Sequence, residues 1–383
     1  MKETILTFPS LLFICLILTA GQACTFPDSR TSEKTYGNTD TVPVAQDPSI
    51  DRMFFIDGQF CQHLVSMKED SRGDLWFGTI VYGLFRYDGE TLHNYHDIEG
   101  VGSGRLISIQ EDDQGVLWMA SASGLTRHVL GTVDSTGTPV FDNYGKDAGL
   151  AEPETWSMLL DPSGDIILGT FSGASRFDQG SFTPLSFPKA VVADTNSILS
   201  YDRVNTLLLD KRGTYWYGMD GFGITCVHSD GRVSHFTKAN GLTDNNVTAL
   251  LEDSEGGIWI ATMYGGISRY DPETGLFRNF TQEGLVEGVE VGALYEDKAG
   301  DIWFAAENSG IYHCDLSQLD KSDSFTNYYK DEGLETNGIL CMMEDSKGRF
   351  WMGGWGCLFR FDRAQGEKTG DYFTVVTEEG PWE

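Results

Sequence analysis

Short hydrophobic stretches separated by polar turns follow one another along most of the chain. In the first such group the pattern predicts strands at 64–68, 75–79, 84–87 and 92–95. Apolar runs of this length, bounded by Gly, Asp and Asn, are typical of β-strands. No long stretch has apolar residues at the i, i+3, i+4, i+7 spacing of an amphipathic helix. We therefore expect a four-stranded meander as the basic unit and almost no helix.

The unit is repeated. A turn and strand of the form Asp-x-x-Gly-x-(Leu/Ile/aromatic)-Trp begins at Asp70, Asp112, Asp161, Asp210, Asp253, Asp297 and Asp345, with Ile167 in place of tryptophan in the third copy. The copies are 42, 49, 49, 43, 44 and 48 residues apart, which matches the length of a four-stranded propeller blade. The sequence predicts an all-β fold, a single seven-bladed β-propeller of four-stranded antiparallel blades.

Each repeated residue type suggests a structural role. Asp at the first and Gly at the fourth position suit a type I turn, in which the carboxylate accepts backbone N–H groups. The tryptophans are expected to wedge against the neighbouring blade, because side chains alternate along a strand. The third-strand arginines are expected to bridge acids between blades; they are Arg86, Arg127, Arg176, Arg269 and Arg360. We expect 372–376 to form the outer strand of the seventh blade, with Met53–Phe55 beside it or across the edge.

The composition argues against some partners. The formal net charge is −30 with a pI near 4.4, so the protein repels phosphate backbones, and nucleic-acid binding is not expected. We interpret much of this charge as repeat residues on a solvated surface rather than as a metal site, and we expect no metal and no cofactor. The cysteines lack a metal-binding spacing and are expected to be free thiols, several of them buried.

The N-terminus has the features of an export signal. An apolar run at 11–20 ends in Gly21-Gln22-Ala23-Cys24, and it is short for a membrane span. Cleavage by ordinary signal peptidase and lipidation at Cys24 are alternatives, of which we favour lipidation. The predicted organisation is a signal peptide at 1–23, a flexible tether at 24–49 and the propeller at 50–383. The expected location is the periplasm, the outer membrane or the bacterial cell surface, with membrane contact only through the lipid.

The repeat resembles a known family. A blade closing in Asn-Tyr or Asn-Phe, then Glu-Gly-Leu, Glu-Asp-x-x-Gly-x-Ile-Trp, a Gly-Gly-Ile loop and Arg-Tyr-Asp is clearest between Asn240 and Asn279. This pattern resembles the two-component regulator propeller repeat. The resemblance implies an extracytoplasmic sensing domain of the kind found in bacterial hybrid histidine kinases. This chain shows no kinase motif, and the resemblance does not identify a ligand.

In a propeller, the loops between strands two and three and the connections into each inner strand lie on one face. We call it the mouth face. Aromatic, amide and charged residues at these positions suit a glycan or another small polar ligand, because sugar rings stack on aromatic side chains and need paired donors and acceptors. The ligand-binding candidates are Tyr82, Arg105, Trp156, Phe171, Asp220, Phe222, Tyr264, Glu290, Glu307, Asn308 and Trp355. Arg203 and Asn245 also lie in these connections.

Two other functions are weighed against a ligand binder. The first is a platform for a membrane-protein partner, which requires a flat apolar patch. The second is an enzyme similar to the streptogramin lyases, with His63 as the nearest candidate base. Catalysis is not expected, because the histidines are scattered and no nucleophile or metalloprotease motif occurs.

Overall fold

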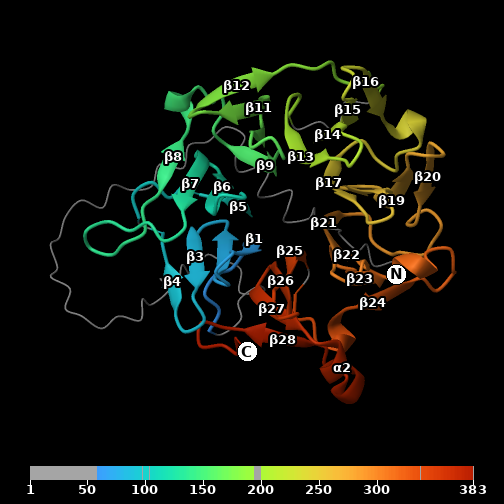
Figure 1. Cartoon of the computed structure of the whole chain (residues 1–383). Helices are drawn as coiled ribbons and strands as arrows, with labels where there is room; N and C mark the ends of the chain where they lie inside the picture. The colour runs from blue at the N-terminus through green and yellow to red at the C-terminus, as the bar shows by residue number, and fades with distance from the viewer. Residues whose placement is uncertain (1–57, 97, 103, 194–199, 337, 383) are drawn as a thin grey trace, which may run out of the picture. The chain divides into compact units, whose positions relative to one another are not determined.

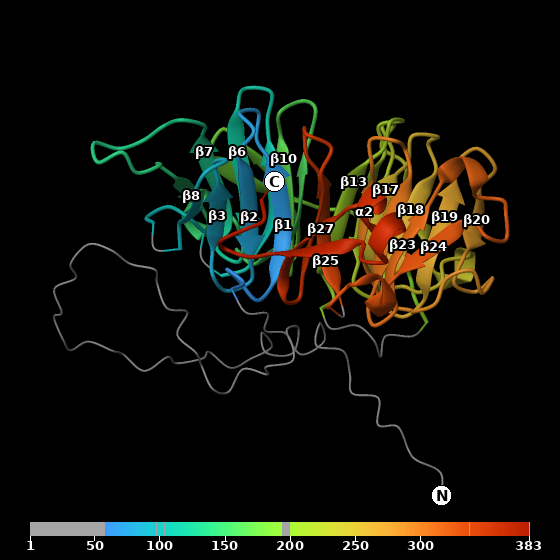
Figure 2. The same ribbon diagram turned by 90° about the horizontal axis from the view of Figure 1, so that it is seen from below.

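The computed structural model describes residues 58–96, 98–102, 104–193, 200–336 and 338–382. These residues form seven four-stranded antiparallel sheets, and the strands in each sheet follow the order of the chain. Figure 1 shows the sheets arranged around a central axis, and Figure 2 shows their strands running between the two faces. The predicted seven-bladed propeller is confirmed.

The strand bounds agree with the pattern to within about one residue in the first blade. Blades one to four consist of β1 (Leu64–Glu69), β2 (Leu75–Thr79), β3 (Leu84–Tyr87), β4 (Leu92–Asn94), β5 (Leu106–Glu111), β6 (Val116–Ser121), β7 (Gly124–Val129), β8 (Asp142–Tyr144), β9 (Thr155–Leu160), β10 (Ile166–Thr170), β11 (Gly173–Asp178), β12 (Ser181–Leu185), β13 (Val204–Leu209), β14 (Tyr215–Met219), β15 (Gly223–Val227) and β16 (Val233–Phe236).

Blades five to seven consist of β17 (Val247–Glu252), β18 (Ile258–Thr262), β19 (Gly266–Asp271), β20 (Leu276–Asn279), β21 (Val291–Glu296), β22 (Ile302–Ala306), β23 (Gly310–Cys314), β24 (Phe325–Tyr328), β25 (Ile339–Glu344), β26 (Phe350–Gly354), β27 (Cys357–Phe361) and β28 (Phe373–Val376). Short 3₁₀ turns occur at Lys146–Ala148, Lys238–Asn240, Leu316–Gln318 and Lys330–Glu332. Within the described ranges the single α-helix is α2 (Arg363–Thr369), between β27 and β28.

The repeated turn holds the repeated tryptophan. Asp70 Oδ1 accepts the N–H groups of Arg72 and Asp74 at 2.9 and 3.0 Å, and Asp70 Oδ2 accepts Trp76 Nε1 at 2.9 Å. The same indole–carboxylate bond, at 2.8 or 2.9 Å, recurs in the five other blades that have tryptophan. The expected turn is thus confirmed. The expected solvation of the repeat aspartates is wrong for Asp70, Asp210, Asp253 and Asp345, which are buried because they pair with the indoles beside them, and for Asp161, which is buried and pairs with a tyrosine.

Each tryptophan packs on the next blade of the ring. Trp76 is fully buried against Leu106, Leu117 and Met119 of blade two, and Trp351 packs on Phe77 of blade one. Gly78 lies on the same face of β2 as Trp76, where an added Cβ would be 2.5 Å from the Leu106 carbonyl oxygen. The predicted wedge between blades is confirmed, and it continues across the last junction.

Glutamates at the ends of inner strands join neighbouring blades. Glu111 accepts the N–H of Ser71, and Glu252, Glu296 and Glu344 accept equivalent N–H groups of the preceding blade, at 2.7–2.9 Å. Glu69 closes the ring in the same way, because it accepts both N–H and Oγ of Ser346 at 2.6 Å. These acids therefore have a structural role in addition to contributing charge.

The junction of blades three and four departs from this pattern. Ile167 replaces tryptophan. Phe187, from the connection between β12 and β13, packs on Tyr217 with ring centres 4.3 Å apart. The hydroxyl of Tyr215 in blade four donates to Asp161 Oδ2, the atom that accepts the indole elsewhere. The glutamate contact that joins other neighbouring blades is also absent at this junction. Pro162 stands at the position of the N–H donor, and Leu209 stands at the position of the accepting glutamate.

The third-strand arginines correct one expectation. Arg86 pairs with Asp74 at 2.7 Å, Arg176 with Asp165 at 3.3 Å and Arg269 with Asp253 at 2.6 Å. These acids belong to the arginine's own blade, as does Asp142, 3.4 Å from Arg127. The expected bridge between blades is wrong, because the turn beside the arginine's own second strand already presents a carboxylate.

The ring closes with consecutive strands. β28 is the outer strand of blade seven, as predicted, whereas Met53–Phe55, the leader and the tether lie outside the described residues.

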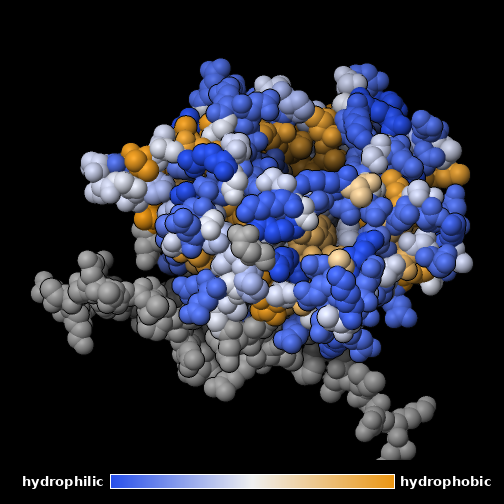
Figure 3. Space-filling view, turned by 60° about the horizontal axis from the view of Figure 1, so that its bottom comes forward, coloured by the Kyte–Doolittle hydropathy of each residue, from blue (hydrophilic) through white to orange (hydrophobic). Residues whose placement is uncertain are grey.

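Cys61, Cys226, Cys314 and Cys341 are free thiols, and the first three are buried. Among the described residues no helix is long and apolar enough to cross a membrane. Figure 3 shows one face on which hydrophobic residues gather in hollows and hydrophilic residues predominate around them.

Candidate functional site

Backbone hydrogen bonds hold the two kinds of mouth-face loop together. In blade six, Glu307 N donates to Glu290 O at 2.8 Å, so that the strand-two loop lies against the connection into the inner strand. Equivalent bonds join Ala122 to Arg105, Asp220 to Arg203 and Trp355 to Gly338, at 2.9–3.3 Å. Residues that are 17 positions apart in sequence are therefore neighbours around the mouth.

One cluster of candidates surrounds Trp156. The Arg105 guanidinium carbon is 3.7 Å from the centre of the Trp156 ring, and that of Arg203 is 4.6 Å away. Phe171 meets the indole edge-on with ring centres 5.3 Å apart. The structure thus brings together three predicted residues, Arg105, Trp156 and Phe171, around one indole.

Acids compensate both arginines. Arg105 pairs with Glu154 at 3.2 Å, and Arg203 pairs with Asp220 at 3.0 Å. Arg203 and Asp220 are only 3% and 2% exposed, and burial lowers the pKa of Arg203 while Asp220 raises it. Arg203 was not among the ligand candidates, although its position in a connection indicated it. Glu154 was missed although it directly precedes its inner strand, as Arg105 and Arg203 do, because Trp156, two residues further on, was chosen in that connection.

Two donors of this cluster are not used within the described structure. Trp156 Nε1 and Arg203 Nε are buried and have no hydrogen-bond partner there. A buried donor without a partner costs free energy, about 1–3 kcal/mol in typical cases. The Trp156 cluster therefore favours an added acceptor such as a hydroxyl or carboxylate oxygen.

A second cluster is acidic. Burial, followed by the charge and hydrogen bond of Glu290, raises the pKa of Glu307 to about 8. At neutral pH Glu307 therefore keeps its proton and shares it with Glu290. Since that proton lies between the two side chains, the pair offers its carboxyl oxygens as acceptors to a ligand at the mouth.

Tyr264 lies within electrostatic reach of both clusters. Burial raises the pKa of its phenol, and the negative charges of Glu290 and Asp220 raise it further, while Arg203 lowers it. The side chain is nevertheless 45% exposed. Tyr264 thus presents an accessible ring among groups from blades four to six.

His63 and Trp355 meet where blade seven joins blade one. Their rings are in edge contact with centres 4.4 Å apart, and Trp355 is 4% exposed. Burial lowers the pKa of His63 to about 4, so the imidazole is neutral at neutral pH. An added Cβ on Gly338 would lie 2.9 Å from Trp355 and 3.9 Å from Glu307, so both predicted residues lie close to one glycine.

The remaining candidates support the loops. Tyr82 packs against the core shared by blades one and seven. Phe222 is 9% exposed and is covered by Tyr201, with ring centres 5.8 Å apart. Asn308 has a φ of 58°, a left-handed conformation that asparagine adopts more readily than most residues. Their role in ligand binding stays a prediction.

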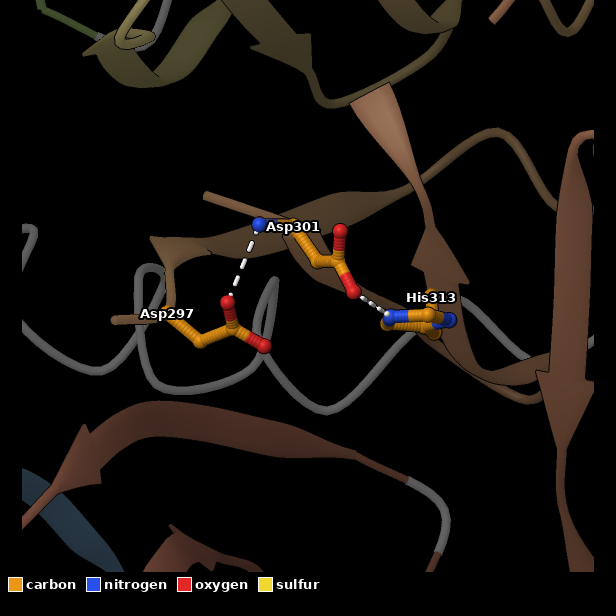
Figure 4. A group of neighbouring side chains, drawn as sticks. All are labelled: Asp297, Asp301 and His313. Atoms are coloured by element: carbon orange, nitrogen blue, oxygen red, sulfur yellow. Dashed lines mark hydrogen bonds and ion pairs between the residues drawn. The ribbon is translucent and has the colours of Figure 1, made fainter. Parts of the chain in front are cut away.

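A different group of residues could in principle hold a metal ion (Figure 4). The ligand atoms of Asp297, Asp301 and His313 lie within 4.8 Å of one another. They come from the β21–β22 turn and β23, at the end of blade six opposite the mouth face. However, Asp297 Oδ1 accepts the Asp301 N–H at 2.9 Å, and Oδ2 accepts Trp303 Nε1 at 2.8 Å.

The position of His313 explains this group without a metal. His313 pairs with Trp303 in the register where Arg86 pairs with Trp76, and its Nε2 is 2.8 Å from Asp301 Oδ2. Arg363 Nη2 is 3.2 Å from the same nitrogen, and its positive charge opposes a metal cation there. We interpret the group as the local equivalent of the Arg86–Asp74 pair.

Comparison with known proteins places the repeat in a family. Residues 241–264 and 333–356 match the two component regulator propeller model, as the sequence resemblance predicted. No curated protein matches the sequence significantly.

Solved structures show the same fold at low sequence identity. The chain is similar to the extracellular domain of the putative hybrid two component system BT3049 from B. thetaiotaomicron, with a TM-score of 0.62 and 21% identity over 79% of this chain. It spans 40% of the length of that domain. It is also similar to PorZ, a surface component of the type-IX secretion system of Porphyromonas gingivalis (TM-score 0.57, 15% identity, 80% of this chain and 47% of that one).

A third similar structure is an inactive virginiamycin B lyase from Staphylococcus aureus with quinupristin (TM-score 0.56, 12% identity, 77% of this chain and 93% of that one). At such identities these similarities show the propeller fold alone.

Proposed function

Because the chain carries two-component regulator propeller repeats, we propose that it is an exported, sensor-type propeller that binds a glycan or another small polar molecule at the mouth face. The observation that carries this proposal is the exposed ring of Tyr264, which lies within electrostatic reach of Asp220, Glu290 and Arg203. A sugar ring stacks on such an aromatic face, and its hydroxyls pair with donors and acceptors around it.

Tyr264 is the aromatic candidate that the described structure leaves most exposed. Arg105 covers the ring of Trp156 at 3.7 Å, and Phe222 and Trp355 are almost fully buried. Tyr264 is therefore the stacking platform. The carboxyl oxygens of Glu290 and Glu307 accept hydrogen bonds, and Trp156 Nε1 and Arg203 Nε are the unused donors.

Thermal unfolding in the presence of an oligosaccharide panel tests this function. A ligand that binds only the folded chain raises the Tm, by mass action. We expect at least one oligosaccharide to raise the Tm of the natural chain, and Tyr264→Ala to abolish most of that shift. Leu276→Ala is the matched control, because Leu276 is also exposed and in the same blade but lies on an outer strand.

Two results would contradict the proposal. One is an unchanged Tm across a broad panel of neutral and charged oligosaccharides. The other is a shift that Tyr264→Ala and Leu276→Ala leave equally intact, because the ligand would then bind elsewhere.

A protein-interaction platform is the second candidate. Exposed apolar side chains occur in mouth-face loops at Val81, Val191, Tyr201 and Val289, with 51–98% exposure. A membrane-protein partner is favoured over a glycan if Val81→Asp and Val289→Asp disrupt a co-purifying complex without changing the Tm. Catalysis is not proposed, since the low pKa of His63 makes it a poor base at neutral pH.

Export and lipid attachment at Cys24 complete the proposal. They are supported by the apolar run and the small residues before Cys24, and by the fold similarity to extracellular domains. Cell fractionation tests the anchor: Cys24→Ser should move the protein from the membrane fraction to the soluble exported fraction. Equal membrane association of both forms would exclude lipidation at this residue.

A further inference from the structure

Blade seven contains an arginine where the other blades have Asp, Val, Thr or Gly. Arg349 follows the turn glycine, at the position of Asp74 in blade one. Its Nε is 2.6 Å from Asp345 Oδ2, and its guanidinium carbon lies 5.0 Å from the centre of the Trp351 ring. In blade five, the third-strand residue Arg269 makes the equivalent bond to Asp253, also at 2.6 Å. Arg349 therefore occupies the turn aspartate that pairs with the third-strand arginine in blade five, and it replaces the aspartate that pairs with that arginine in blades one and three.

Arg360, the third-strand arginine of blade seven, is left without that partner. Within the described residues it makes no hydrogen bond or ion pair, whereas its four counterparts in other blades each pair with an acid. Arg360 is half-buried and lines a cavity of about 630 Å³ between blades six and seven. A partly desolvated guanidinium is stabilised when an oxyanion binds it.

A second arginine faces the same cavity. Arg363 is the first residue of α2 and lines the cavity with Arg360. Its contact is His313 Nε2 at 3.2 Å, which is not a charge-compensating carboxylate. The two arginines are three residues apart in the chain and line the same cavity.

Each acid that lines the cavity already has a neighbouring hydrogen-bond partner. Asp297 accepts Trp303 Nε1, Asp301 faces His313, Glu344 accepts the Lys298 N–H and Asp362 accepts the Gln365 N–H. Trp303, Phe350 and Phe361 provide apolar surface in the lining. The cavity is within the roughly 300–1,000 Å³ range of small-molecule sites.

We propose that this cavity binds the carboxylate of a small organic acid with a compact apolar body, with Arg360 and Arg363 as the cationic groups. Fork-shaped guanidinium groups match the geometry of a carboxylate. The apolar body lies against the aromatic lining. This site is on the blade edge away from the mouth face and does not depend on the function proposed there.

Calorimetry and arginine side-chain NMR on the full chain test the proposal with benzoate, its neutral analogue benzamide, and inorganic phosphate. We expect benzoate to bind, to shift the Arg360 Nε–Hε resonance, and to bind more tightly than benzamide or phosphate. Arg360→Gln should weaken benzoate binding about tenfold or more, the size expected for loss of one charge-assisted hydrogen bond. Arg360→Lys should retain part of the affinity.

Arg127→Gln is the matched control, because Arg127 has the same register in blade two but pairs with Asp142. It should leave benzoate binding unchanged, and the Tm of each variant shows whether it has folded. The proposal is overturned if benzoate fails to bind or leaves the Arg360 resonance unmoved. It is also overturned if benzamide or phosphate binds equally well, or if a folded Arg360→Gln binds benzoate like the natural chain.

Discussion

At the scale of single residues, Glu307 shows how the mouth face alters side-chain chemistry. An exposed glutamate loses its proton near pH 4.5, whereas burial and the neighbouring Glu290 raise the pKa of Glu307 to about 8. The fold thus retains a proton that the unfolded chain releases. A strongly shifted pKa of this kind is more characteristic of binding sites than of purely structural positions.

The stability of the protein should therefore fall as pH rises from about 4.5 to about 8. Below this window Glu307 is protonated in both states, and its contribution to stability is fully present; within it only the folded chain keeps the proton. Glu307→Gln should remove this part of the pH dependence, on the order of 2 kcal/mol after allowance for partial exposure. Urea unfolding at pH 5 and pH 8 measures it.

Glu335→Gln, at an exposed position, is the control and should retain the full pH dependence. If Glu307→Gln and the natural chain lose the same stability between the two pH values, Glu307 is not the titrating group. The sequence placed Glu290 and Glu307 on one face, because both occupy loop positions of the repeat. It did not show that they share a proton, which depends on burial by non-repeated neighbours.

At the scale of elements, the blade is largely readable from sequence. The Asp-x-x-Gly turn, the alternation in the second strand and the position of the tryptophan are local, so β1 to β4 could be predicted closely. The residue that donates to Asp161 in place of the missing tryptophan of blade three, Tyr215, could not be predicted from the sequence. Tyr215 is 54 residues from Asp161, and only the packing of blade four on blade three brings its hydroxyl to that carboxylate.

Tyr215→Phe should destabilise the protein by about 2 kcal/mol, because it leaves Asp161 without the donor that an indole supplies in other blades. Urea unfolding measures the loss, and a double-mutant cycle with Asp161→Ala isolates the pair. Tyr270→Phe is the control, a partly buried tyrosine for which no hydroxyl hydrogen bond is described. Equal losses in the two Tyr→Phe variants would show that the Tyr215 bond contributes nothing specific.

At the scale of the whole molecule, ring closure depends on residues outside the repeat. The seven-fold pattern predicted the number of blades and the outer strand β28, but 377–382 has no equivalent in other blades. Trp382 stacks on Tyr87 of blade one at 4.2 Å, and its carbonyl accepts Arg349 Nη1 of blade seven at 2.6 Å. The tail therefore joins the first blade to the last where no strand is exchanged between them.

Trp382→Ala should lower the free energy of unfolding by about 3 kcal/mol or more, as expected for truncation of a buried tryptophan. The loss should exceed that of an ordinary tail substitution, because the indole also contacts Phe77 and Trp351 across the closing junction. Glu379→Ala, at an exposed position in the same tail, should change stability by less than about 0.5 kcal/mol. Urea unfolding followed by circular dichroism compares the two. Similar midpoints for both variants would mean that the glutamate contacts and the Trp351 wedge close the ring without the tail.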